Sequence, residues 1–228
     1  MIGSRNRVLG SLLAQREERV VECEFMTTPF RLDGRRALVT GGASGIGEET
    51  CRVLTAAGAA VTIADIDQPR AEALSKELPG SSVIVVDITD AETVNRSFAA
   101  IPHLDILINN AGIGLVGNLE ETAHEDFQRL FRVNVEGLYL VTKAAIPKLL
   151  ASKGSIVNLG SVAGLVGLKR RFAYCATKGA VVALSRQMAL DYAGRVRVNC
   201  VCPGTVEPVT ALFMFELPPL PPFAPLLP

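Results

Sequence analysis

A glycine-rich turn between a short apolar segment and a helical one places the strongest constraint on how this chain folds. The turn runs Thr40-Gly41-Gly42-Ala43-Ser44-Gly45-Ile46-Gly47, after an apolar segment at 37–40. Glycines at this spacing let the backbone approach a pyrophosphate, and the amino end of the following helix favours its charge. The turn therefore predicts a dinucleotide site to which Gly41, Ser44, Gly45, Ile46 and Gly47 contribute.

The alternation of strand and helix continues along the chain. We expect further strands at 60–64, 82–86, 105–109, 155–159 and 195–201, and helices at 45–57, 67–78, 90–100, 123–150 (in one or two segments) and 174–192. The strands are almost continuously apolar, which is typical of parallel strands covered on both faces. The pattern predicts an α/β fold with one doubly wound parallel sheet, a Rossmann fold, that binds its ligand at the carboxyl ends of the strands.

Length and charge fit one domain with flanking segments. The chain has 228 residues, of which 49% are hydrophobic, and 23 basic residues balance 23 acidic ones. A nucleic-acid binder would show a basic excess, and no apolar run reaches the length of a membrane span. The five cysteines are odd in number and scattered, and neither they nor the two histidines have the spacing of metal ligands. We expect a cytoplasmic protein with reduced thiols and a small-molecule substrate, and no metal, nucleic-acid or membrane partner.

Both ends of the chain differ from the middle. Residues 1–30 mix arginines with glutamates and lack the apolar segment of a signal peptide. Residues 208–228 hold seven of the thirteen prolines, a density that forbids helix and interior strand. We therefore divide the chain into an N-terminal extension at 1–30, a dinucleotide-binding oxidoreductase domain at 31–207 and a proline-rich tail at 208–228.

A tyrosine and a lysine four residues apart carry the reactive chemistry. Tyr174 and Lys178 share one face of a predicted helix, and Ser161 lies thirteen residues before the tyrosine. An ammonium group beside a phenol favours the phenolate, which makes the tyrosine a usable proton acceptor. Singly, Ser161 could be a turn serine and Tyr174 a core aromatic. Together with a dinucleotide that exchanges hydride, they predict an oxidoreductase that interconverts an alcohol and a ketone.

An acidic residue at the end of the second strand bears on the choice of cofactor. Asp65 lies 24 residues after Gly41, and no arginine or lysine follows it immediately. A carboxylate here can accept hydrogen bonds from the adenosine ribose and repels the 2′-phosphate of NADP. Asp65 could instead cap the next helix, but Asp67 is better placed to do so. The sequence therefore favours NAD, with NADP as the weaker alternative.

Taken in order, the motifs resemble those of the short-chain dehydrogenase/reductase family. The resemblance covers about 33–207 and rests on the glycine turn, Asp65, Asp87, the run Asn109-Asn110-Ala111-Gly112, Asn134, the Ser161/Tyr174/Lys178 set and Pro203-Gly204. It implies that Tyr174 is the acid/base and Ser161 orients the substrate oxygen. It also implies that Lys178 binds the nicotinamide ribose and that Asn134 holds a water linking Lys178 to solvent.

The resemblance also implies further cofactor contacts. Asp87 would contact the adenine, while Asn109 and Gly112 would lie along the cofactor; Asn109 could instead mainly tie neighbouring strands together. The remaining implied contacts are Ile88, Ala111, Pro203, Gly204 and Val206.

The chain departs from the family pattern after Val206. Pro208 stands near where the family usually has a threonine, and no pattern of a substrate lid or a seventh strand follows. We therefore expect a truncated or divergent carboxyl end that lacks both elements and leaves an exposed sheet edge. A cofactor-binding but catalytically impaired protein, acting as a binding or interaction module, is the alternative to an active enzyme.

Two further expectations concern the substrate and the partner. The segment 168–172, Leu-Lys-Arg-Arg-Phe, resembles dehydrogenases that act on sugars, sugar acids or hydroxy acids, although we favour a solvated basic turn. The resemblance also implies a homodimer through the long helices at 123–150 and 174–192. The second of these helices carries apolar residues on more than one face, which is more than one sheet contact needs.

Overall fold

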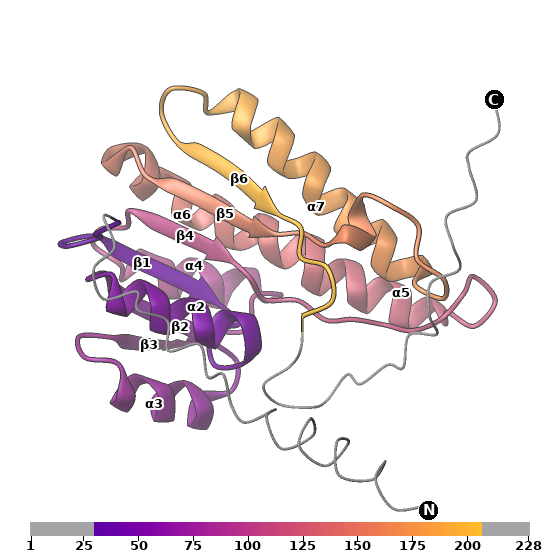
Figure 1. Cartoon of the computed structure of the whole chain (residues 1–228), viewed down its shortest axis with the longest axis horizontal. Helices are drawn as coiled ribbons and strands as arrows, with labels where there is room; N and C mark the ends of the chain where they lie inside the picture. Colours follow the sequence, from indigo (N-terminus) through magenta and orange to yellow (C-terminus); the bar gives the residue numbers. More distant parts are fainter. Residues whose placement is uncertain (1–29, 207–228) are drawn as a thin grey trace, which may run out of the picture. The chain divides into compact units, whose positions relative to one another are not determined.

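A six-stranded parallel sheet organises the part of the chain that the computed structural model describes, residues 30–206 (Figure 1). The strand order is β3-β2-β1-β4-β5-β6, and the described residues from Leu32 onward belong to one structural unit. This confirms the predicted doubly wound fold and single domain. The proline-rich tail lies outside the described residues, and so does the N-terminal extension apart from Phe30.

The elements alternate along the chain as predicted. The strands are β1 (Arg36–Thr40), β2 (Ala60–Asp65), β3 (Ser82–Val85), β4 (Ile106–Asn109), β5 (Ser155–Leu159) and β6 (Arg197–Val201). The helices are α2 (Gly45–Ala56), α3 (Gln68–Glu77), α4 (Ala91–Ala99), α5 (His124–Phe131), α6 (Leu138–Ser152) and α7 (Phe172–Asp191), with a π-helical turn η2 (Arg132–Gly137) and a 3-10 turn η3 (Val162–Gly164). Every predicted boundary lies within two residues of the observed one.

Two hydrophobic cores lie between the sheet and its helices, one on each face of the sheet. On one face, α2 and α3 pack against the sheet through Cys51, Ala71 and Leu74. On the other face, α4 and α6 bury Phe98 and Leu149, each at most 1% exposed. Helices therefore cover both faces, which is why the strands are apolar without the alternation of a half-exposed sheet.

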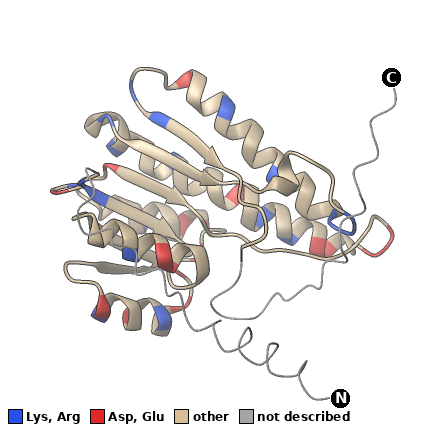
Figure 2. Ribbon diagram, in the orientation of Figure 1, with Lys and Arg blue, Asp and Glu red and all other residues tan. Residues whose placement is uncertain are grey.

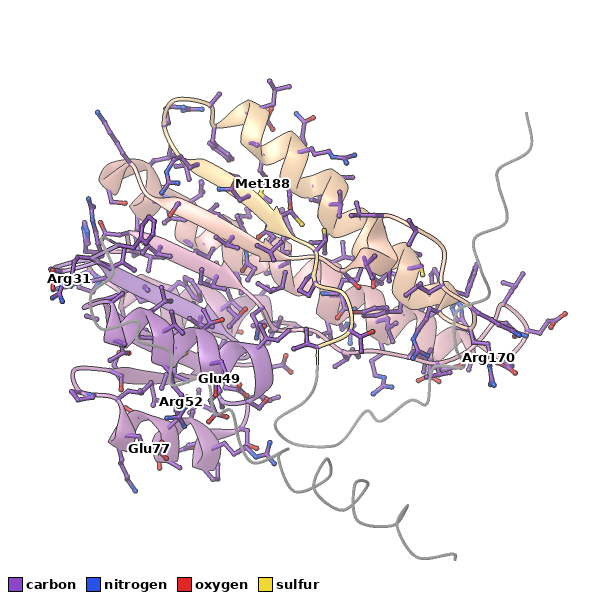
Figure 3. All side chains as sticks on the ribbon, viewed as in Figure 1. Arg31, Glu49, Arg52, Glu77, Arg170 and Met188 are labelled. Carbon is purple, nitrogen blue, oxygen red and sulfur yellow. The ribbon has the colours of Figure 1, made fainter. Side chains whose placement is uncertain are left out.

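Ion pairs add to the contact between α2 and α3. Arg52 on α2 lies 2.7 Å from Glu48 on its own helix and 2.8 Å from Glu77 on α3 (Figure 3). Basic and acidic positions are interspersed over the helices and loops in the view of Figure 2. Among residues 30–206, no helix is long and apolar enough to cross a membrane.

Strand register brings the motif-bearing ends together. Thr40 at the end of β1 pairs with Asn109 at the end of β4, and Leu159 of β5 pairs with Val201 of β6. The chain order reverses between β1 and β4, and this switch point is where a doubly wound sheet leaves a crevice for ligands.

The last strand is exposed on one face. β6 pairs with β5, and its alternate residues Arg197, Asn199 and Val201 are exposed. The residues between them, Val198 and Cys200, are half-buried. Six strands are described, and the expected absence of a seventh strand and of a lid falls on residues outside 30–206.

Candidate active site

The glycine turn forms an open cradle at the amino end of α2. Gly45 has φ +54°, and a Cβ placed on it would meet no atom within 4 Å. A Cβ on Gly47 would instead collide with the carbonyl oxygen of Gly41, so this position tolerates only glycine. Ser44 stands at the N-cap without a side-chain capping bond, which leaves its hydroxyl available to a ligand. These features fit a pyrophosphate at the helix end.

The side chains of Asn110 and Thr40 hold the cradle in place. The Asn110 amide donates to the carbonyl oxygens of Thr40 and Gly41 at 3.0 and 2.9 Å. The Thr40 hydroxyl accepts from the main-chain nitrogens of Asn110 and Ala111, both at 3.1 Å. The sequence motifs include both residues but predict no role for either. Their contact depends on the pairing of β1 with β4, which the sequence does not specify.

The Asp65 carboxylate already receives two main-chain hydrogen bonds. The nitrogen of Ala43, inside the glycine turn, donates to Oδ2 at 2.9 Å, and the nitrogen of Asp67 donates to Oδ1 at 3.0 Å. An ionised carboxylate offers about four acceptor positions, so capacity remains for ribose hydroxyls. The capping role belongs to Asp67, as predicted, because its side chain accepts from the nitrogen of Arg70.

Asp87 and Ile88, the two cofactor contacts expected after β3, differ in their exposure to solvent. Asp87 is exposed, and its Oδ1 accepts from the nitrogen and hydroxyl of Thr89, both at 2.8 Å. Ile88 is only 9% exposed and packs against Gly137, where a Cβ would lie 2.6 Å from it. The Ile88 side chain therefore belongs to the core, and only its main chain remains for a cofactor contact.

Asn109, on β4, lies in a buried network that also includes side chains of α6, β5 and α7. Its amide donates to the Thr142 hydroxyl of α6 at 2.9 Å and to the Asn158 oxygen of β5 at 2.8 Å. Asn158 in turn donates to the hydroxyl of Ser185 on α7 at 2.8 Å. The side chain of Asn109 therefore ties strands and helices together, which was the structural alternative. A contact along the cofactor stays a prediction.

Lys178 and Asn134 converge on the loop after β4, and Tyr174 lies one helical turn before Lys178 on α7. The Nζ of Lys178 lies 5.9 Å from the centre of the Tyr174 ring and donates to the carbonyl of Leu159 at 2.7 Å. A Cβ on Gly112 would be 3.6 Å from this Nζ and 3.1 Å from Oδ1 of Asn134. Lys178 is 6% exposed, and burial lowers the pKa of its ammonium group.

The π-helical turn η2 carries Asn134 into the protein. The Asn134 Oδ1 accepts from the nitrogen of Ile113 at 2.8 Å. Its amide donates to the carbonyl of Ile113 and to the hydroxyl of Thr177, at 2.9 and 3.1 Å. Asn134 thereby fastens the loop after β4 to α7, next to Lys178. Such wide turns are often found at functional sites.

Ser161 lies between the end of β5 and α7. Its hydroxyl accepts from the nitrogen of Ala163 at 3.1 Å, and the nitrogen of Val162 donates to the carbonyl of Pro203 at 2.9 Å. The turn η3 that follows packs on α7, where a Cβ on Gly164 would lie 2.6 Å from the main chain of Lys178. Pro203 is half-buried, whereas Gly204 and Val206 are exposed just beyond β6.

Two loops meet beside Tyr174. The nitrogen of Gly117 donates to the carbonyl of Arg170 at 3.0 Å, and the nitrogen of Phe172 donates to the carbonyl of Gly117 at 3.1 Å. The Arg170 guanidinium contacts Glu121 at 3.1 and 3.2 Å (Arg170 is labelled in Figure 3). The charge of Arg170 is thus already paired, which favours the basic-turn interpretation of 168–172 for this residue.

Comparison with known proteins agrees with these features. A sequence profile described as short chain dehydrogenase matches residues 35–216, which extends past the last motif that we assigned. The 2-(S)-hydroxypropyl-CoM dehydrogenase 3 of Xanthobacter autotrophicus is 42% identical over 186 residues, covering 77% of this chain and 73% of the relative. The L-fucose dehydrogenase of Mus musculus is 39% identical over 187 residues, covering 79% and 68%.

A solved structure shares the fold. The crystal structure of a short chain dehydrogenase from Shigella flexneri, complexed with NADP, superposes with a TM-score of 0.74 at 28% identity, covering 78% of this chain and 80% of that one. The profile match, the identity to named dehydrogenases and the shared fold lead to one conclusion: this chain belongs to the short-chain dehydrogenase family, and is an oxidoreductase by membership.

Proposed function

We propose that the protein is an NAD-dependent dehydrogenase that interconverts a secondary alcohol and a ketone. The observation that carries the proposal is the approach of Lys178 and Asn134 to Gly112, one helical turn from Tyr174 and beside the segment of Ser161. The proposed proton acceptor Tyr174, the Lys178 cation and the Ser161 hydroxyl come from segments near the carboxyl ends of the strands. The open glycine cradle lies at the same end of the sheet. Proton and hydride chemistry can therefore occur at one place.

Each side chain has a distinct task in the proposed reaction. A bound nicotinamide dinucleotide supplies the hydride acceptor or donor. Tyr174 takes the hydroxyl proton at its phenol oxygen during oxidation and returns it during reduction. The Ser161 hydroxyl donates to the substrate oxygen and orients it. The Lys178 ammonium group, 5.9 Å from the centre of the Tyr174 ring, binds the nicotinamide ribose, and Asn134 holds the water through which protons reach solvent.

The preference for NAD is argued from Asp65. Its carboxylate sits at the end of β2 beside the cradle, held by main-chain donors on both oxygens. A second negative charge at hydrogen-bond range is strongly repelled in a partly desolvated site. The related structure with NADP means that family membership alone does not decide the cofactor.

Cofactor binding tests this preference without requiring turnover. The purified protein should bind NADH more tightly than NADPH in a fluorescence titration, and Asp65→Ala should narrow the difference. The main-chain bonds of Asp65 will also be lost, so a thermal melt must accompany the titration. Equal or tighter NADPH binding by the unchanged protein would reject the assignment.

We propose a sugar, a polyol or another hydroxylated small molecule as substrate. The names of the two relatives give their substrates as 2-(S)-hydroxypropyl-CoM and L-fucose. The pairing of Arg170 with Glu121 removes one of the cations that a sugar acid would need. We therefore favour neutral substrates within the wider class of sugars, sugar acids and hydroxy acids, and a panel of these with NAD provides the comparison.

Replacing Tyr174 with phenylalanine tests the catalytic assignment. Turnover should fall by about a hundredfold or more, because positioned acid/base groups contribute at least that much. NADH affinity should stay within about twofold, since the ring still packs and only the phenol oxygen is lost. Tyr192→Phe, at the other end of the same helix, is the matched control and should keep full activity.

The outcomes separate enzyme from binding module. Residual activity of Tyr174→Phe above roughly a hundredth would place the base elsewhere. NADH binding without turnover on any substrate would favour the catalytically impaired module instead.

We also propose that the protein forms a homodimer through α5, η2 and α7. An open groove of about 870 Å³ runs along these elements and the start of α6, and none of the candidate site residues lines it. Its lining combines apolar side chains with charges of both signs, which can pair when the same patch of two copies meets across a two-fold axis. The lining includes Phe127, Phe131, Val135, Tyr139 and Leu184, with Glu125, Arg129, Arg132 and Glu136.

A further inference from the structure

Two cysteines lie in contact at the end of β6, beside the candidate site but outside the chemistry assigned to it. Cys200 belongs to β6 and Cys202 follows the last residue of that strand; their sulfur atoms are 3.8 Å apart. Both are free and half-buried, whereas Cys51 is fully buried. Side chains two residues apart in a strand point to the same face, so the spacing itself brings the thiols together.

The surroundings of the pair limit its chemistry. Within residues 30–206, no group of three or more His, Cys, Asp or Glu side chains could hold a metal ion. A structural zinc site needs four ligands, so two thiols alone do not make one. What two adjacent thiols can do unaided is exchange with a disulfide.

The strand geometry makes such a disulfide possible but strained. Strands rise about 3.2–3.4 Å per residue, so Cα atoms two residues apart are separated by about 6.4–6.8 Å. Disulfides span Cα distances of about 4.4–6.8 Å, most often 5.5–6 Å, with the sulfurs about 2.05 Å apart. Closure therefore contracts the chain by up to about 1 Å, and strained disulfides are the readily reduced ones.

We propose that Cys200 and Cys202 form a dithiol modification site that low-molecular-weight disulfides oxidise to an intramolecular disulfide. One cysteine thiolate attacks the sulfur–sulfur bond of the oxidant, forms a mixed disulfide and releases one thiol. The second cysteine attacks that mixed disulfide and releases the second thiol. Two cysteine thiols are oxidised, one external disulfide is reduced to two thiols, and the two cysteine protons pass to the leaving thiolates.

The position of the pair couples it to the candidate site. A Cβ on Gly160 would lie 2.8 Å from the sulfur of Cys202 and 2.9 Å from that of Cys200, so both thiols rest on the residue before Ser161. The nitrogen of Gly160 donates to the carbonyl of Val201 at 2.8 Å, which lies between the two cysteines. Contraction from Cys200 to Cys202 therefore shifts an anchor of the Ser161 segment.

The same contraction reaches a second anchor of the Ser161 segment. Pro203 directly follows Cys202, and its carbonyl accepts from the nitrogen of Val162, on the other side of Ser161. Both anchors of Ser161 thus depend on the span that the disulfide shortens. Oxidation should lower turnover about tenfold to a hundredfold, because a displacement near 1 Å can cost about that much. This effect on turnover rests on the proposed dehydrogenase function; formation of the disulfide does not.

Peptide mass spectrometry tests disulfide formation directly. The reduced full-length protein is incubated with oxidised glutathione, denatured and alkylated. The peptide that holds both cysteines should lose two hydrogens and carry no alkyl group, and dithiothreitol should reverse this. Cys175→Ser, the matched control, should give the same product. Cys200→Ser and Cys202→Ser should each retain one glutathione on the remaining cysteine; the second variant serves if the first fails to fold.

Other results would overturn the proposed disulfide or its effect on turnover. A doubly alkylated peptide, or glutathione on both cysteines, would overturn the proposed site. Turnover of the unchanged protein should fall after oxidation and recover with dithiothreitol. The two serine variants cannot form the Cys200–Cys202 disulfide, so they should not show the loss of turnover that this disulfide causes. A disulfide that leaves turnover unchanged would overturn the coupling. No turnover in the reduced protein would count against the proposed function, and the mass measurement would still decide the site.

Discussion

Replacing Lys178 with methionine distinguishes the effect of this buried ammonium group on folding stability from its proposed role in binding the cofactor. Lys178 is 6% exposed, and burial lowers the pKa of its ammonium group below the ordinary value of 10.5. The unfolded chain therefore holds this proton more tightly than the folded protein does. The charged side chain opposes folding in full below the folded pKa, and the opposition disappears as the pH rises above 10.5.

The expected magnitudes follow from what the methionine removes. It leaves the Leu159 carbonyl without its 2.7 Å donor, which costs about 1–3 kcal/mol when the group is buried. Relief of the buried charge offsets this cost. The free energy of unfolding should change by less than about 2 kcal/mol, which is less than about 8 °C in melting temperature for a chain of this size.

Cofactor affinity should respond far more strongly. A hydrogen bond to a charged group contributes about 1.5–3 kcal/mol, so loss of the proposed ribose contact should weaken NADH binding roughly 10- to 150-fold. Thermal melts followed by circular dichroism and NADH fluorescence titrations measure the two effects. Lys76→Met, on the exposed surface of α3, is the matched control and should change neither.

The pH dependence adds a second readout for the same variant. Relative to Lys178→Met, the unchanged protein should gain stability as the pH rises from neutral towards 10.5. A fall in melting temperature of more than about 8 °C with NADH affinity unaltered would refute the reasoning. Lys178 would then be a structural residue.

Three further predictions concern the two loops joined by Arg170, the stability of the protein at low pH and the proposed dimer. Arg170→Ala should cost less than about 1 kcal/mol of stability, because its pair with Glu121 is exposed, but should raise KM more than it lowers kcat as the two loops loosen. Burial opposes ionisation of Asp105, but hydrogen bonds, the strongest from the Arg36 nitrogen, hold its pKa below 3.8. The stability that the carboxylate contributes should therefore be lost as the pH falls through this lowered pKa. The urea midpoints of the unchanged protein and of Asp105→Asn should converge over the same pH range. Leu184→Glu, in the proposed interface groove, should convert a dimer into a monomer in light scattering, and a monomeric unchanged protein would reject the interface.

Local rules predicted the fold well because each applied within a few residues. The helix after β2 begins after Asp67 because a short acceptor side chain can bind the free nitrogen three residues on, as observed with Arg70. The glycine turn ended one strand and opened one helix because its backbone and its space allow only glycine at positions such as Gly47. Such features need no knowledge of distant residues.

Tertiary features were beyond the same rules. The apolar spacing at 127–133 is helical, and nothing in it shows that the turn at 132–137 widens to carry Asn134 towards Ile113 and Thr177. The cofactor contact expected of Ile88 stays a prediction, but nothing in its own segment shows that its side chain fills the space that Gly137 leaves. Both outcomes depend on which element packs alongside, and a residue pattern within one segment does not contain that information.

The hydrogen bonds of the candidate site form two main sets, which the side chains of Asn109 and Asn134 connect. The adenosine side is fixed by β1, β2 and β4, through Thr40, Asp65 and Asn110 around the glycine turn. The reactive side is fixed by β5, β6 and α7, through the bond of Lys178 to Leu159 and the anchors on both sides of Ser161. A disturbance at the edge strand β6 reaches the second set directly. It should therefore reduce turnover more than dinucleotide affinity, because the contacts of the first set remain intact.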